Sequence, residues 1–275
     1  MCGIVGFVGE EPAAPILLSG LEKLEYRGYD SAGIAVRNEE TGRIEVVKAK
    51  GRLKILAEKT DGGMAVPGTC GIGHTRWATH GEPSENNAHP HCTEDKSVVL
   101  VHNGIIENYQ ELKEKLLKSG YSFYSQTDTE IAVKLVDYYY KKTGTPLEAL
   151  TRAMLRIRGS YAFGVMFKDC PGRLFAARKD SPLIIGKHES GCLIASDVPA
   201  SWTEQEMFTI SETWRSRNLE RMRSTSIILT AKRSIRIWWR SSGMQNPQRK
   251  ADMSILCLRR SMNSPKPCRI RLAPM

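Results

Sequence analysis

The chain has 275 residues, with 40 Lys and Arg against 30 Asp and Glu, and a formal net charge of +10. Apolar residues make up 41% of it, which is enough for a buried core. No apolar run approaches the roughly 18 to 20 residues of a membrane span. No Lys or Arg precedes the apolar N-terminal stretch, as a secretory signal would require. We therefore expect a cytoplasmic protein that does not bind membranes.

The positive charge is confined to the C-terminal part of the chain. Residues 201–275 hold 15 Lys and Arg against 5 Asp and Glu, which leaves 25 of each sign for residues 1–200. Four of the five tryptophans also lie in 201–275, and its residues follow neither a strand period nor a helix period. We expect this tail to be disordered and interpret it as translated out of frame.

The apolar pattern predicts strands at the start of the chain, and helices follow the first and the fifth of them. Short apolar runs bounded by Gly, Asn or Asp predict strands at 3–9, 32–38, 43–50, 70–75 and 97–106. Apolar side chains at helical spacing predict helices over 13–25, through Ile16, Leu17, Leu21 and Leu24, and over 107–118, through Tyr109, Leu112, Leu116 and Leu117.

Two further helices have start signals in the sequence. Thr127 and Glu130 form a capping-box pattern before an apolar run. Thr145 precedes Pro146, and Glu148 follows at the third helical position. The last strands are predicted at 161–168, 173–179, 182–188 and 192–198. Strands, then helices, then more strands, without regular alternation, favour an α+β fold built on antiparallel sheets.

Cys2 follows the initiator methionine, and this position has chemical consequences. Removal of Met1 leaves one residue with a thiol and a free α-amine. An α-amine with a pKa of about 7.7 to 8.0 is partly neutral near pH 7 and can accept the thiol proton. The alternative is a buried structural cysteine, which is the commoner role of a free thiol.

Several stretches together closely resemble the glutaminase domain of glutamine–fructose-6-phosphate aminotransferases, over residues 2 to about 200. They are CGIVG at 2–6, LEYRGYDSAG at 24–33, GHTRWATHGEPSENNAHPH at 73–91, VHNGIIENY at 101–109 and SQTDTE at 125–130. The resemblance implies an N-terminal-nucleophile αββα sandwich of two antiparallel sheets flanked by helices, here incomplete at its C-terminal strands. The sugar isomerase domains of the family have no counterpart in this sequence.

The resemblance also implies how the site works. Cys2 attacks the side-chain amide carbon of glutamine and releases ammonia. The Asn103 side chain and the Gly104 N–H form the oxyanion hole, and fixed donors of this kind stabilise a developing oxyanion. Without the resemblance, Asn103-Gly104 reads as an ordinary turn.

Four residues match the positions that hold glutamine in the family. Arg76 suits the α-carboxylate and Asp128 the α-ammonium. Thr79 and His80 lie in the same stretch as Arg76. Taken alone, Arg76 would be a surface arginine and Asp128 a residue that complements a helix dipole.

Two residues are expected to gate or support the site. By resemblance, the loop from Arg76 to about Pro83 closes over glutamine, and Trp77 moves to guard the ammonia path. Arg27 lies in the other specific stretch and is expected to support the site.

No cofactor is expected, and no metal. His80, His89, His91 and Cys92 could ligate zinc, but their spacings miss the usual CxxC and HxxxH patterns. All seven cysteines are spread without a CxxC pair, which favours free thiols in a reducing compartment: Cys2, Cys70, Cys92, Cys170, Cys192, Cys257 and Cys268.

The sequence thus predicts a glutaminase whose partner is glutamine and which does not bind nucleic acid. Fructose-6-phosphate would be a partner only if another chain supplied an isomerase domain. One alternative is another amidotransferase of this class, phosphoribosyl or asparagine-forming. The other is a nucleic-acid-binding module that uses the basic, Trp-rich tail.

Overall fold

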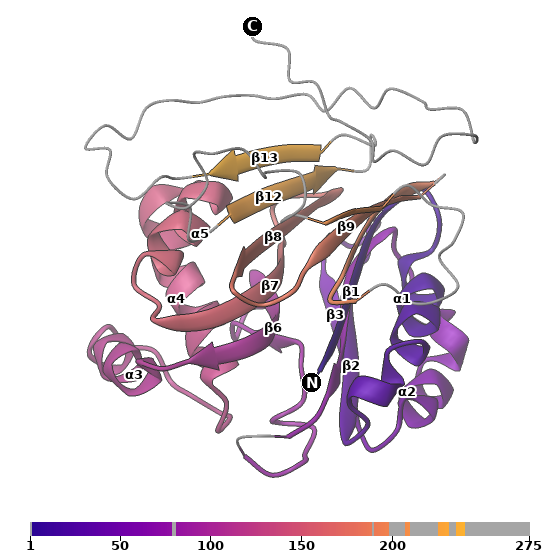
Figure 1. The fold of residues 1–275 in the computed structure, drawn as a ribbon, viewed down its shortest axis with the longest axis horizontal. Coiled ribbons are helices and arrows are strands. Elements are labelled where there is room, and N and C mark those ends of the chain that lie inside the picture. Colours follow the sequence, from indigo (N-terminus) through magenta and orange to yellow (C-terminus); the bar gives the residue numbers. More distant parts are fainter. Residues whose placement is uncertain are drawn as a thin grey trace, which may run out of the picture.

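Two antiparallel sheets lie face to face, and helices cover both outer faces (Figure 1). This computed structural model describes residues 2–78, 81–188 and 190–197, together with segments 207–209, 225–230 and 235–239. The predicted α+β sandwich of antiparallel sheets is confirmed. None of the described helices combines the length and the apolar character that a membrane span requires.

The first sheet has seven strands and carries the N-terminus near its centre. Its order is β11-β9-β10-β1-β4-β2-β3. Helices α1 (Ala13–Glu22) and α2 (Leu53–Lys59) cover its outer face (Figure 1). The strands are β1 (Gly3–Gly9), β2 (Ser31–Arg37), β3 (Ile44–Lys50), β4 (Cys70–Arg76), β9 (Ile184–His188), β10 (Gly191–Ala195) and β11 (Met207–Thr209).

The second sheet has six strands in the order β13-β12-β8-β7-β6-β5. Helices α3 (Tyr109–Lys118), α4 (Asp128–Thr143) and α5 (Pro146–Met154) lie on its side of the molecule (Figure 1). The strands are β5 (His91–Cys92), β6 (Val98–Ile106), β7 (Gly159–Phe167), β8 (Arg173–Lys179), β12 (Thr225–Thr230) and β13 (Ile235–Trp239).

An apolar layer separates the two sheets. Successive side chains of a strand point to opposite faces. On β4, Cys70 and Ile72 face the other sheet, and on β6, Val99 and Val101 face back toward them. His74 and Asn103 are the next positions on these same faces. A buried apolar layer therefore leads directly to two polar side chains at the end of the sandwich.

The predicted helices are present, but α1 is shorter than predicted and the apolar face of α3 is narrower than predicted. Helix α1 ends at Glu22, and Leu24 is buried beyond it. On α3, Leu112 and Leu116 are buried, whereas Leu117 is 51% exposed and Tyr109 is 36% exposed. Only these two positions of α3, four apart, are buried, because the helix packs against α4 along one narrow stripe.

The expectation that the tail lacks regular structure is wrong for three segments. Strand β11 pairs with β9, β12 pairs with β8, and β13 pairs with β12. The sequences TSIILT and IRIWW are rich in β-branched and aromatic residues, which favour strands. The rest of 201–275 lies outside the described residues.

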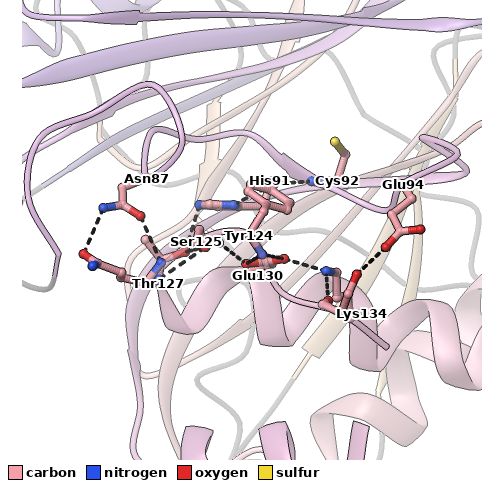
Figure 2. A network of polar contacts seen from close by, with 11 residues as sticks. Asn87, His91, Cys92, Glu94, Tyr124, Ser125, Thr127, Glu130 and Lys134 are labelled. Carbon is pink, nitrogen blue, oxygen red and sulfur yellow. Dashed lines mark hydrogen bonds and ion pairs between the residues drawn. The ribbon is translucent and has the colours of Figure 1, made fainter. Parts of the chain in front are cut away.

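Helix α4 starts at the predicted residue, but without the predicted capping box. Thr127 is the N-cap residue, and its side chain makes no capping bond. Its hydroxyl instead contacts His91 Nε2 at 2.9 Å. The Glu130 carboxylate accepts the N–H groups of Tyr124 and Ser125, at 2.9 and 2.7 Å (Figure 2). The segment before the helix is therefore held from inside the fold.

Glu130 and Lys134 form a buried ion pair one turn apart on α4. Their side chains are 0% and 3% exposed, and Nζ lies 2.5 Å from Oε1. Lys134 also donates to the Ser122 carbonyl. The pair thus connects α4 to the segment that leads into it (Figure 2). Asp128 begins α4, so this pair also determines where Asp128 lies.

We predict that Lys134→Met lowers the free energy of unfolding by about 3 to 5 kcal/mol, because Glu130 would keep a buried, unpaired charge. Arg152→Met is the matched control. Its i,i+4 partner is Glu148, and both side chains are about half exposed, at 49% and 48%. An exposed pair of this kind contributes at most about 1 kcal/mol. Urea unfolding of both variants measures the difference, and equal losses would contradict the prediction.

Candidate active site

Cys2 lies immediately before β1 and contacts two other segments of the chain. Its carbonyl accepts a hydrogen bond from Asn103 Nδ2 at 2.8 Å. Its sulfur accepts the backbone N–H of Trp77 at 3.3 Å. The predicted nucleophile, the predicted oxyanion donor and the predicted gating residue therefore meet at one point.

Burial raises the pKa of the Cys2 thiol above its ordinary value. The Trp77 N–H and the nearby Arg76 guanidinium act in the opposite direction but do not reverse the shift. The sulfur therefore holds its proton at neutral pH. Nucleophilic attack by this thiol requires a base close to it.

Gly104 follows Asn103 on β6 in a backbone conformation that favours glycine. Its φ is +130°, and a Cβ there would lie 2.2 Å from the Ser160 carbonyl oxygen. This close approach to β7 excludes any side chain. Gly104 is exposed and directly follows Asn103 on β6.

Four buried histidines lie behind Asn103: His74, His89, His91 and His102. The rings of His74 and His89 stack with centroids 4.0 Å apart. Burial lowers the pKa of His74 to about 3 and the pKa values of the other three below their usual range. All four are neutral at pH 7. No group of three or more His, Cys, Asp or Glu among the described residues could hold a metal ion.

Arg76 ends β4 and holds the loop that follows it. Its guanidinium donates to the carbonyls of Gly81 and Glu82, at 3.2 and 3.4 Å. The side chain is 4% exposed, so it is not the surface arginine that its residue type alone suggests. Thr79 and His80, which the sequence also predicted at the site, lie outside the described residues.

Trp77 is an exposed residue of this loop. Its side chain is 47% exposed, and its ring contacts Tyr29 edge to face, with centroids 5.3 Å apart. The next residue, Ala78, donates its N–H to the Asp30 carboxylate. Asp30 thus holds the start of the loop that carries the Trp77 N–H to Cys2. The sequence analysis did not select Asp30, although it lies in the LEYRGYDSAG stretch.

Asp128 faces the site from the start of α4. One carboxylate oxygen accepts the N–H of Ile106 at 2.9 Å, two residues after Gly104. The other oxygen lies 3.9 Å from His102 Nδ1, and the side chain is 24% exposed. The carboxylate is therefore anchored to β6 and remains partly exposed to solvent, as a ligand for an incoming cation requires.

Arg27 supports the start of β1 through residues that follow β10. Its guanidinium forms a 2.6 Å ion pair with Asp197 and also donates to the Ser196 carbonyl. The Ser196 hydroxyl in turn accepts the Ile4 N–H at 3.0 Å. Arg27 therefore fixes the chain after β10 against the strand that follows Cys2.

Comparisons with known proteins agree with this site. The glutamine amidotransferase domain family matches residues 74–201. A relative named glutamine–fructose-6-phosphate aminotransferase from Caldanaerobacter subterraneus subsp. tengcongensis is 54% identical over 200 residues, 73% of this chain and 32% of the relative. One of the same name from Pyrococcus horikoshii is 50% identical over 210 residues, 76% of this chain and 35% of the relative. The chain thus spans about a third of the length of these relatives.

Solved structures share the fold. Glutamine phosphoribosylpyrophosphate amidotransferase from B. subtilis superposes with a TM-score of 0.69 at 24% identity, covering 87% of this chain and 49% of that one. A glutamine aminotransferase class-II domain protein from Silicibacter pomeroyi has a TM-score of 0.57 at 13% identity, covering 88% and 99%.

These matches and the αββα architecture define a glutamine amidotransferase domain with the N-terminal-nucleophile fold. Within that class, the domain is the glutaminase part found in relatives named glutamine–fructose-6-phosphate aminotransferase.

We predict that Gly104→Ala destabilises the domain by about 1 to 3 kcal/mol or more, because the backbone is strained and Ser160 must move. Gly144→Ala is the control. Gly144 ends α4 at φ +65°, and a Cβ there would meet nothing within 4 Å. Gly144→Ala should lower the free energy of unfolding by only about 1 kcal/mol. Thermal unfolding compares the two, and a smaller loss at Gly104 would contradict the prediction.

We predict that the domain loses stability as the pH falls below about 6.5. The unfolded state binds a proton at His74 below its ordinary value of 6.5, but the folded state does not until about pH 3. The free energy of unfolding therefore falls with pH in this window, by up to about 1.4 kcal/mol per pH unit for each such histidine. Urea unfolding between pH 5.5 and 7.5 tests this, and constant stability across that range would contradict it.

Proposed function

We propose that this domain hydrolyses the side-chain amide of glutamine, with Cys2 as the nucleophile. One observation carries the proposal. Cys2 is held between the Trp77 N–H and the Asn103 side-chain amide, at the end of the apolar layer between the sheets. A purely structural cysteine would have no need of a side-chain amide donor beside it.

The reaction begins with proton transfer from the Cys2 thiol to its own α-amine, once Met1 has been removed. The raised pKa of the thiol makes this base necessary. The sulfur forms a bond to the amide carbon, and the carbonyl electrons move onto oxygen. Asn103 Nδ2 and the Gly104 N–H stabilise that oxyanion. The amide nitrogen takes up the proton and leaves as ammonia, and water then cleaves the thioester to give glutamate.

Arg76 and Asp128 would hold the two charged groups of glutamine. The Asp128 carboxylate is partly exposed, so the α-ammonium can reach it. Arg76 carries a planar guanidinium with five N–H donors, a geometry that suits the two oxygens of the α-carboxylate. We assign Thr79 and His80 to the same substrate site on the resemblance of their stretch.

Trp77 and Arg27 would not contact the reacting atoms. Trp77 would cover the site, and Arg27 would support the strand that follows Cys2. Arg76 holds the loop through the Gly81 and Glu82 carbonyls, and the same loop carries the exposed Trp77 ring. Binding of glutamine to Arg76 would change these contacts and move Trp77 over the site. Arg27 keeps the start of β1 in place.

The destination of the ammonia is a further part of the proposal. The relatives are named for transfer to fructose-6-phosphate, and this chain matches about a third of their length. We propose that residues 1–200 supply the ammonia that an isomerase domain uses to make glucosamine-6-phosphate from fructose-6-phosphate. Residues 201–275 would be an out-of-frame tail, and the nucleotide sequence from codon 195 onward tests that interpretation.

We predict that Cys2→Ala abolishes glutamate release and also abolishes labelling by a glutamine analogue with an electrophilic carbon. Cys170→Ala is the matched control, because Cys170 is also a half-buried free thiol. It should leave both measurements unchanged. Mass spectrometry of the labelled protein should place the adduct on a chain that begins at Cys2. An unlabelled Cys2 in folded protein would refute the proposed function.

A further inference from the structure

His74 lies at the centre of the first sheet and reaches across to the second. Strand β4 pairs with β1 on one side and β2 on the other, and His74 is opposite Ile4 and Gly33. The ring nitrogen Nε2 lies 3.0 Å from Asn103 Oδ1 and 3.1 Å from the His102 carbonyl oxygen. Both partners are on β6, in the other sheet.

The two partners determine which nitrogen of His74 carries the proton. A carbonyl oxygen and an amide oxygen are both acceptors, so Nε2 must be the donor. The ring is 1% exposed and uncharged at neutral pH, since burial lowers its pKa to about 3. His74 is therefore a fixed, neutral N–H donor shared between two oxygens.

This donor determines the orientation of the Asn103 amide. Because Oδ1 faces His74, Nδ2 must face the opposite way, where it donates to the Cys2 carbonyl at 2.8 Å. An amide nitrogen carries two N–H groups. The second remains for an oxyanion formed at the Cys2 sulfur. If the amide turned over, it would present an acceptor there, and an acceptor repels an oxyanion.

We propose that His74 is a positioning residue for glutamine hydrolysis, which keeps the Asn103 amide nitrogen directed at the oxyanion. This inference rests on the proposed function, since it assumes that Asn103 stabilises the oxyanion. His74 does not touch the substrate. It acts through Asn103 alone, and this dependence makes the inference testable.

The experiment is a double-mutant cycle with His74→Phe and Asn103→Ala. Phe keeps a ring against His89 and removes the donor. Loss of one oxyanion donor costs about 100- to 1,000-fold in kcat. We expect His74→Phe to lower kcat about 10- to 100-fold, with KM changed less than about 3-fold. In the Asn103→Ala background, His74→Phe should lower kcat no further.

Two further variants separate positioning from stability. His89→Phe removes a histidine that is also buried and stacked on His74, but whose ring accepts the His102 N–H at 3.3 Å. It should lose thermal stability while keeping kcat near the wild-type value. His74→Gln retains an N–H donor and should recover part of the kcat lost in His74→Phe. The melting temperature of each variant shows that it is folded.

The outcomes distinguish this inference from the proposed function. If wild-type protein releases no glutamate, or Cys2→Ala still does, the proposed function fails and this inference fails with it. If hydrolysis depends on Cys2 and Asn103, but folded His74→Phe has wild-type kcat, only the inference is overturned. It is also overturned if His74→Phe lowers kcat by the same factor with and without the Asn103 side chain.

Discussion

The site depends on one side chain that bridges the two sheets. The Asn103 amide donates to the Cys2 carbonyl from one end and accepts from His74 at the other. Cys2 precedes β1 and His74 is on β4, both in the first sheet, while Asn103 belongs to the second. Any sliding of one sheet over the other would break both bonds. The apolar layer between the sheets resists such sliding because interiors are close-packed. The packing of the two sheets therefore determines the distance between Cys2 and the Asn103-Gly104 segment.

Buried polar groups surround the Asn103 side chain. The free-energy cost of burying them stays small because each is either uncharged or paired with an opposite charge. The histidines behind Asn103 remain uncharged, which avoids the large cost of a buried ion. Glu130 and Lys134 are charged but paired, and they hold the segment that leads to Asp128 (Figure 2). The charged groups assigned to substrate are placed differently. Asp128 is partly open to solvent, so an incoming ammonium can reach it.

Much of the fold could be predicted from local pattern, and the errors have local causes. The strand predictions at 3–9 and 173–179 match β1 and β8 residue for residue. Helix α2 was missed because its seven residues bury only Leu53 and Leu56. The capping box failed because Thr127 and Glu130 find partners in residues 91, 124 and 125, which no local rule can anticipate. Strand β12 depends on pairing with β8, and β13 on pairing with β12, and a period count within the tail does not detect either.

The sequence by itself determined the class of chemistry, because Cys2, Arg76, Asn103, Gly104 and Asp128 lie in stretches specific enough to identify the family. Only the tertiary structure decided how these residues act together. The bond between Asn103 and Cys2 joins positions 101 apart, and the bond between Asp30 and Ala78 joins positions 48 apart. Such contacts form only when the sheets pack. No local sequence pattern therefore predicts the contacts that His74 and Asp30 make. Burial likewise shifts the pKa values of Cys2 and His74, and burial is a property of the folded chain.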